Sequence, residues 1–303
     1  MIPEFPEFKK IELSDKQEVE QYTKGFPPYS DFDFISMLSW DIAGAMRLSR
    51  LNGNLVVRFT DYVTSTPFFS FIGNNLLNET TEALLNYSLQ EGIEPLLKFI
   101  PAEMATVLDQ KKFSISEDRN SFDYIYSTAE HKSFSGGNFS GKRNEVSSIM
   151  KSHPENEAVV IDVYNSDVQK GMIELYKKWG DNKLASSKGF EAHEEAAFNR
   201  LMSIASENIG ELKGIGVYHK NELLAFCIYE LANSEYAVGH TAKCDVSIKG
   251  TNALLMKSLA NILYSSGILY FNYEQDLGLE NLRISKERYR PTFFLKKHIV
   301  KLL

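Results

Sequence analysis

The sequence predicts an α/β protein with mixed sheets (an α+β arrangement of strands), built as two tandem domains. Its 303 residues suffice for two domains of roughly 150 residues, each able to bury its own core. The hydrophobic content of 43% and the charged content of 24% are those of an ordinary globular protein. The third observation is that the two halves repeat one order of strand and helix signals.

In the first half, a polar turn around Gly53 is followed by β-branched and aromatic runs at 55–59 and 68–72, which predict a strand pair. Residues 81–100 then place apolar side chains at helical spacing, followed by Gly92-Ile93 and a strand-like run.

The second half opens with "AVVIDVYNSD" (158–167), a predicted strand that ends at a possible helix cap, Asn165 or Ser166. Helical patterns follow at 167–179 and 190–207. Strands follow at 223–230 and 235–242, and a helix from Thr251 leads to Gly267-Ile268 and another strand. The order β-α-α-β-β-β-α-β-α-β resembles the N-acetyltransferase-like (GNAT) acyltransferase fold. The polar stretch 140–157 marks the junction, so we expect domains at 1–145 and 146–303.

The stretch "SGGNFSGKR" (135–143) has the glycine and lysine spacing of a Walker A loop. That loop needs a strand running directly into its glycines, and Ser or Thr after the lysine to hold magnesium. Here eight residues separate the end of the strand-like run 123–127 from Gly136, and Arg143 occupies the Ser/Thr position. We therefore predict a glycine-rich turn leading into a basic helix, Lys142 to Lys151, and no nucleotide site.

The net charge of −7 is uneven, because the excess of acid lies in residues 1–150. The C-terminal stretch 282–303 carries seven lysines and arginines against Glu287 alone, which could attract an anionic partner or form a solvated face. We expect no DNA partner. Cys227 and Cys244 are too few for a disulfide framework and predict free thiols in a reducing, cytoplasmic setting. No apolar run reaches the roughly 18 residues of a membrane span, and no signal peptide is visible.

Four stretches together resemble one family: "FPPYSDFDFISMLSW" (26–40), "DYIYS" (123–127), "SGKRNEVSSIM" (140–150) and "FNYEQDLGLENLRISKERYRP" (271–291). The family is the cytoplasmic domain of phosphatidylglycerol lysyltransferases with its stand-alone relatives, and the resemblance runs from about residue 26 to 295. It implies two tandem GNAT-like domains. In characterised members it implies transfer of an aminoacyl group from charged tRNA to a lipid. Those members also carry a large membrane-spanning region that is not found here, which puts a lipid acceptor in doubt.

The densest group of polar residues is "ILYFNYEQDLG" (268–278). Alternate residues of a strand share a face, so Asn272, Glu274 and Asp276 are predicted to gather near the strand's end, as candidate catalytic groups. Glu274 or Asp276 could bind an acceptor ammonium or take its proton. The alternative is that they cap the next helix or pair with Arg283 and Lys286.

The donor is expected to be anionic, acyl-CoA or aminoacyl-tRNA, with no tightly bound cofactor. Helix N-termini bind phosphates, and the matching turn here offers Lys243, Lys249, Gly250, Thr251 and Asn252. Arg283, Lys286 and Arg290 are spaced to share a helix face that could hold a CoA or tRNA phosphate or simply be solvated. The first half's counterpart, "GNNLLNETTEALL", has two glutamates and no cation, so the N-terminal domain is predicted to be non-catalytic.

Other candidates carry weaker signals. His193 and His240 lack metal-ligand companions at useful spacing, so no metal site is predicted. By resemblance, Tyr29, Ser30 and Phe32 would line the cleft between the domains, with His240 beside them.

The sequence thus predicts direct acyl or aminoacyl transfer to an amine or hydroxyl acceptor, with backbone N–H groups stabilising the carbonyl oxyanion. Two alternatives remain open at this point. One is an acetyl-CoA-dependent N-acetyltransferase. The other is a catalytically silent ligand-binding module, which the poor phosphate loops of both halves would suit.

Overall fold

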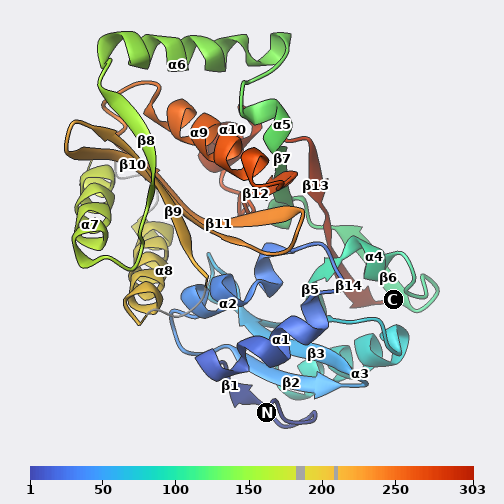
Figure 1. Ribbon diagram of the computed structural model, residues 1–303. Coiled ribbons are helices and arrows are strands. Elements are labelled where there is room, and N and C mark those ends of the chain that lie inside the picture. The colour runs from blue at the N-terminus through green and yellow to red at the C-terminus, as the bar shows by residue number, and fades with distance from the viewer. Residues whose placement is uncertain (182–187, 208–210) are drawn as a thin grey trace.

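The computed structural model describes residues 1–181, 188–207 and 211–303, which form two seven-stranded mixed sheets. Figure 1 shows one sheet above the other, with α2 and α8 between them. The mixed α/β class and the GNAT-like tandem arrangement predicted from the sequence are confirmed.

The first sheet has the strand order β1-β2-β3-β4-β5-β14-β6. Its strands are β1 (Lys9–Lys10), β2 (Arg47–Leu51), β3 (Asn54–Thr60), β4 (Pro67–Ile72), β5 (Leu96–Pro101), β14 (Lys297–Leu302) and β6 (Phe113–Glu117). The helices of this half are α1 (Lys16–Thr23), α2 (Phe34–Trp40), α3 (Leu77–Gln90) and α4 (Ala102–Ala105).

The second sheet has the order β13-β7-β12-β11-β10-β9-β8. Its strands are β13 (Phe293–Leu295), β7 (Asp123–Ser127), β12 (Tyr270–Asn272), β11 (Tyr236–Cys244), β10 (Glu222–Leu231), β9 (Lys213–His219) and β8 (Asn156–Ile161). Its helices are α5 (Thr128–His131), α6 (Ser140–Ser152), α7 (Ser166–Asp181), α8 (Lys188–Ser206), α9 (Thr251–Ser265) and α10 (Glu280–Glu287).

The internal repeat is visible in the strand pairing. In the first half the antiparallel hairpin β3–β4 leads through α3 to β5, which pairs with β4 in parallel. In the second half the antiparallel hairpin β10–β11 leads through α9 to β12, which pairs with β11 in parallel. Both hairpins, both helices and both returning strands were predicted from the apolar periodicity.

The sheets do not divide at the predicted position 145/146. Strand β7 comes from the first half but pairs with β12 and β13 of the second sheet. Strand β14 comes from the C-terminus but lies between β5 and β6 of the first sheet. Each exchange places a strand beside a sheet edge that would otherwise leave backbone groups unpaired, and it ties the two halves together. Propensity cannot reveal such pairing, because it depends on partners distant in sequence.

The glycine-rich turn behaves as the sequence predicts. Helix α5 separates β7 from the turn, and α6 begins at Ser140. The Arg143 guanidinium donates to the carbonyl oxygens of Phe134 and Gly136, at 2.5 and 2.6 Å, and so closes the turn. No strand runs into these glycines, as a phosphate-binding loop would require.

Candidate functional site

A cavity of about 130 Å³ lies between the two halves of the chain. The first half contributes Ser30 and residues of α2 with Tyr62, and the second half contributes β11, α8 and the loop after β12. The polar residues that line it are Ser30, Ser36, Ser39, Tyr62, Glu194, His240, Thr241, Lys243, Tyr273, Glu274, Gln275 and Lys286. Both halves are therefore needed to form the cavity.

The backbone kinks where β12 ends, and this kink sets the directions of Glu274 and Asp276. Strand β12 ends at Asn272, whose side-chain oxygen accepts a hydrogen bond from the Glu274 amide at 2.8 Å. Glu274 and Leu277 both have positive φ, +55° and +56°, which L residues adopt at a cost. The predicted alternation of one strand face therefore fails beyond Asn272, and Glu274 and Asp276 do not lie together.

Glu274 is the predicted catalytic residue that reaches the cavity. Its carboxylate accepts a hydrogen bond from the Ser36 hydroxyl at 3.0 Å. Burial raises the pKa of Glu274 to about 7, and the nearby charges of His240 and Lys286 lower it only partly. A carboxyl group that titrates near neutrality can exchange protons with a bound substrate.

Asp276 is held by cations instead. It is fully buried and accepts from Arg283 Nε at 2.8 Å, Arg119 at 3.0 Å, Tyr124 at 2.6 Å and the Gly278 amide at 2.8 Å. Burial alone would raise the pKa of Asp276, but these bonds lower it below its ordinary value. It does not line the cavity, and its contacts are those of a structural ion pair.

Asn272 is fully buried next to the cavity-lining residues and supports Glu274 through its side chain. Its side-chain amide donates to the Pro28 carbonyl at 2.7 Å, while its oxygen holds the Glu274 amide. It therefore positions Glu274 and does not face the cavity itself.

His240 enters the cavity because of a β-bulge. Ile228 pairs with Thr241 and Tyr229 with Gly239, so His240 is the extra residue of β11. Bulges of this kind redirect a side chain. Burial lowers the pKa of His240, but the carboxylates of Glu230 and Asp33 outweigh it and raise that pKa to about 9.

Three residues beside His240 were not predicted. Asp33 caps α2 by accepting from the Ser36 amide at 2.9 Å. The Ser36 hydroxyl lies 3.2 Å from Nδ1 of His240, and Glu230 lies 3.4 Å from Nε2. The Asp-x-x-Ser signal at the start of α2 marks a helix cap in the sequence, but only the fold brings it beside β10 and β11.

The predicted cleft residues divide between two hollows. Ser30 lines the cavity between the halves. Tyr29 and Phe32 line a separate groove of about 750 Å³, together with Asp33 and Glu230. Tyr29 donates to Glu103 at 2.7 Å, so its hydroxyl has a structural partner.

Of the predicted donor-binding turn, residues 243–252, only part is free to contact a ligand. Lys243 lines the cavity and pairs with Glu194 at 2.7 Å. Lys249 is exposed, Asn252 is half-buried, and the Thr251 hydroxyl donates to the Ile248 carbonyl at 2.7 Å. Gly250 has a φ of +93°, and a Cβ atom there would lie 2.6 Å from the Glu145 carbonyl oxygen of α6. The start of α9 is thus packed against α6.

The predicted basic face of 283, 286 and 290 is not formed. Arg283 is bound to Asp276, and the Lys286 ammonium turns inward to donate to the carbonyl oxygens of Tyr273 and Gln275. Burial lowers the pKa of Lys286 to about 8. Helix α10 ends at Glu287, so Arg290 lies beyond it. Arg283 and Lys286 turn toward neighbouring carboxylate and carbonyl groups. The spacing of residues along one helix cannot reveal these partners, because they belong to other parts of the chain.

A second buried cluster, formed by Asp31, Asp123 and Lys297, joins the two halves. These three residues are not among those that line the cavity. The Lys297 ammonium is fully buried and pairs with Asp31 and Asp123. Asp123 also accepts from the Ser30 amide and hydroxyl, at 2.8 and 2.6 Å, and Asp31 accepts from Gln275 at 2.8 Å. Lys296 and Lys301 pair with Glu117 and Glu94, so much of the C-terminal basic stretch is engaged within the protein.

Comparison with known proteins shows which family the chain belongs to. The family described as phosphatidylglycerol lysyltransferase, C-terminal, matches residues 26–301. The chain belongs to this family. By its description, this family is one of transferases.

Solved structures share this fold. A conserved protein of unknown function from Bacteroides thetaiotaomicron is 25% identical with a TM-score of 0.82, and 100% of each chain is covered. The L-PGS structure from Bacillus licheniformis is 14% identical with a TM-score of 0.62, over 99% of this chain and 93% of that one.

Among curated proteins, an uncharacterized protein of Mycoplasmoides gallisepticum is 24% identical over 186 residues, 61% of this chain. The match spans 57% of the length of that relative. Within residues 1–181, 188–207 and 211–303, no helix has both the length and the apolar character that crossing a bilayer requires.

Proposed function

We propose that this protein transfers an aminoacyl group from an aminoacyl-tRNA to an amine or hydroxyl acceptor, with Glu274 as the general base. The observation that carries the proposal is the Glu274 carboxyl group, which faces the cavity and has a pKa near neutrality. The family membership supports the aminoacyl donor.

The reaction would be a direct transfer. The acceptor nitrogen or oxygen attacks the aminoacyl carbonyl carbon, and a new C–N or C–O bond forms as the ester bond to the tRNA ribose breaks. Glu274 takes the proton that the acceptor loses and passes it to the departing ribose oxygen, which returns Glu274 to its carboxylate form. The Ser36 hydroxyl donates to Glu274 and so fixes the carboxylate.

The strand edge beside Glu274 supports an oxyanion role for backbone N–H groups. Strand β11 pairs with β12 only from Tyr236 to Val238, yet it continues to Cys244. Residues Gly239 to Lys243 of β11, beyond its pairing with β12, line the cavity. N–H groups at such an edge suit a developing negative charge on the carbonyl oxygen.

The packing of α6 on α9 favours tRNA over CoA as donor. A CoA pyrophosphate would need the N–H groups at the start of α9, and Gly250 there lies against the α6 backbone. An acetyl-CoA-dependent reaction would use the same Glu274 and cavity, so the experiment must separate the donors.

The experiment offers the purified protein labelled aminoacyl-tRNAs or acetyl-CoA with a panel of amines, hydroxyl compounds and phospholipid vesicles, and measures label transfer. We expect transfer from aminoacyl-tRNA, and a fall in kcat of about 10²–10⁴-fold in Glu274→Gln with donor affinity retained. The matched control is Glu280→Gln, because Glu280 is exposed on α10. A Glu274→Gln variant as active as the wild type would contradict the role of Glu274 as the base. Transfer from acetyl-CoA alone would mean that the donor is acetyl-CoA and not aminoacyl-tRNA.

A further inference from the structure

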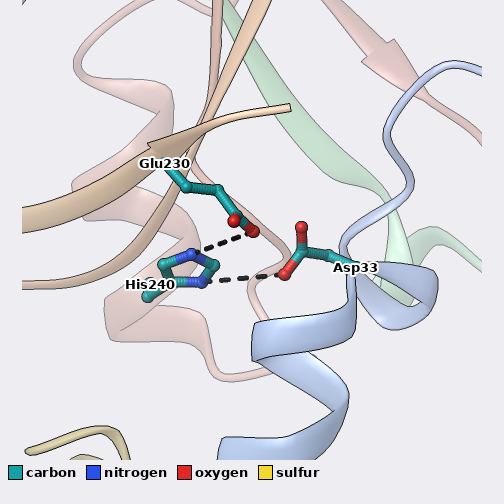
Figure 2. A group of neighbouring side chains, drawn as sticks. All are labelled: Asp33, Glu230 and His240. Atoms are coloured by element: carbon teal, nitrogen blue, oxygen red, sulfur yellow. Dashed lines mark ion pairs between the residues drawn. The ribbon is translucent and has the colours of Figure 1, made fainter. Parts of the chain in front are cut away.

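Asp33, Glu230 and His240 form a buried cluster of two carboxyl groups around one imidazole. The side chains of Asp33 and Glu230 are 8% exposed, and that of His240 is 1% exposed. Figure 2 shows both carboxylates directed at the imidazole ring, Asp33 from the start of α2 and Glu230 from the end of β10. Lys16 lies in the neighbourhood, but its ammonium pairs with Glu20. Buried carboxylates without a counter-charge are costly, so a cation is expected among them.

The direction of the hydrogen bonds locates that cation. The Ser36 hydroxyl has one proton, and it donates that proton to Glu274 at 3.0 Å. Ser36 Oγ therefore acts as the acceptor at its 3.2 Å contact with His240, and Nδ1 must carry the imidazole proton. In the neutral ring the lone pair on Nε2 then faces Glu230 Oε1, 3.4 Å away.

Nε2 is the orphan of this arrangement. Among the described residues it is one of the buried polar atoms without a hydrogen-bond partner, since its contact with Glu230 lacks hydrogen-bond geometry. Two lone pairs that face each other in a buried place repel unless a proton or a metal ion lies between them. A separation of 3.4 Å is that of two ligand atoms on a tetrahedral ion with bonds of roughly 2.0–2.1 Å.

We propose that Asp33, Glu230 and His240 bind one divalent transition-metal ion, with Zn²⁺ as the best match. One nitrogen of His240 and one oxygen of each carboxylate lie within 4.8 Å of one another, so small side-chain movements would bring three ligands onto one ion. One imidazole with two carboxylates is a set that Zn²⁺ accepts, with a fourth position left for water.

The surroundings meet two further requirements of a metal site. Ser36 orients both halves of the cluster, because its amide donates to Asp33 at 2.9 Å and its hydroxyl faces Nδ1 of His240. Such partners fix a ligand's direction. Asp33 and Glu230 also line the open groove of about 750 Å³, which gives an ion a route in. The ion would join the first half, through Asp33, to the second half, through Glu230 and His240.

The experiment uses the full chain without an affinity tag, stripped with a chelator and then equilibrated with buffered micromolar Zn²⁺. We expect one tightly held Zn²⁺ per chain by elemental analysis, and a rise in melting temperature, because an ion that binds only the folded state stabilises it. Glu230→Gln and His240→Gln should each weaken Zn²⁺ binding by about tenfold or more. Co²⁺ in place of Zn²⁺ should give the visible absorption of a tetrahedral site in the wild type and not in Glu230→Gln.

The matched control is His219→Gln. The rings of His153 and His219 lie 5.1 Å apart and could capture Zn²⁺ adventitiously. Zn²⁺ binding that is lost in His219→Gln but kept in Glu230→Gln would overturn the proposal. So would a wild type that retains no Zn²⁺, in which case a proton on Nε2 is the occupant. Glu230→Gln keeps the size of the side chain, so the test remains decisive if His240→Gln fails to fold. None of these readouts depends on transferase activity.

Discussion

Glu274 and Asp276 stand two residues apart on one loop, yet their surroundings are opposite. Asp276 is surrounded by donors, two of them guanidinium groups, and its pKa is lowered. Among the described residues, Glu274 has the Ser36 hydroxyl as its side-chain donor; it faces a cavity, and its pKa is raised to about 7. A fully paired carboxylate holds structure, whereas a carboxylate left short of partners keeps the capacity to exchange a proton.

The same contrast separates the two buried clusters between the sheets. Asp31 and Asp123 share the Lys297 ammonium and several further donors. Asp33 and Glu230 share one imidazole, whose Nε2 has no hydrogen-bond partner. The saturated cluster ties the halves together, and the unsaturated one is the proposed ion site.

The largest effect is expected from Asp276→Asn. Removing this charge leaves Arg119 and Arg283 facing a neutral amide in a buried place, so the free energy of unfolding should fall by about 2–4 kcal/mol. That range is reduced because both guanidinium groups are about one-third exposed. Urea denaturation measures the change, with Glu280→Gln as the control. A loss no greater than the control's would mean that Asp276 is not structural.

Gly250→Ala sharpens the comparison between the start of α9 and the cavity. The positive φ and the close Glu145 carbonyl should together lower the free energy of unfolding by about 1–3 kcal/mol. Thermal melting measures this effect. If alanine is tolerated here at no cost, α6 does not pack on α9 as described.

Glu274→Gln should act in the opposite direction from Asp276→Asn. The folded-state pKa of Glu274, about 7, lies above its ordinary value of 4.5, so the group's contribution to stability is present below pH 4.5 and is lost as the pH rises through 7. At pH 8 the glutamine variant should therefore be more stable than the wild type, by about 1–2 kcal/mol. The difference should shrink as the pH falls and vanish below about pH 4, under the unfolded-state pKa. Melting temperatures at both pH values provide the measurement, and equal stabilities at pH 8 would count against a buried charge.

The smallest effect is expected from Lys249→Glu. Lys249 is exposed, so the free energy of unfolding should change by no more than about 0.5 kcal/mol. Aminoacyl transfer should also persist, because this lysine lies outside the cavity. Two results together would make the start of α9 the candidate donor site again. One is loss of donor binding in this variant, and the other is a rise in the wild type's melting temperature with CoA.

Much of the fold was readable from local patterns. The hairpins at 54–72 and 222–244 and the helices that follow them depend on periodicity within short windows. The exchange of β7 and β14 between sheets was not readable, because strand pairing depends on residues more than 100 positions apart.

The site was predictable only in part, for the same reason. Glu274 was predicted because polar residues after a strand are a local signal. The sequence could not separate its role from that of Asp276, because the Arg119 that pairs with Asp276 lies far away in the sequence. Ser36, Glu230 and Asp33 carry no local mark of function, since their positions depend on a helix cap, a strand end and a bulge meeting at one point.

The measurement that tests the account most directly is a carbon-13 NMR titration of the Glu274 carboxyl group, assigned by comparison with Glu274→Gln. It needs no substrate and reports on the group proposed as the base. We predict a titration midpoint near pH 7, while Asp276 titrates below its ordinary value. A Glu274 midpoint below pH 5 would contradict the central claim, because the carboxylate would then be too weak a base to take the acceptor's proton near neutral pH.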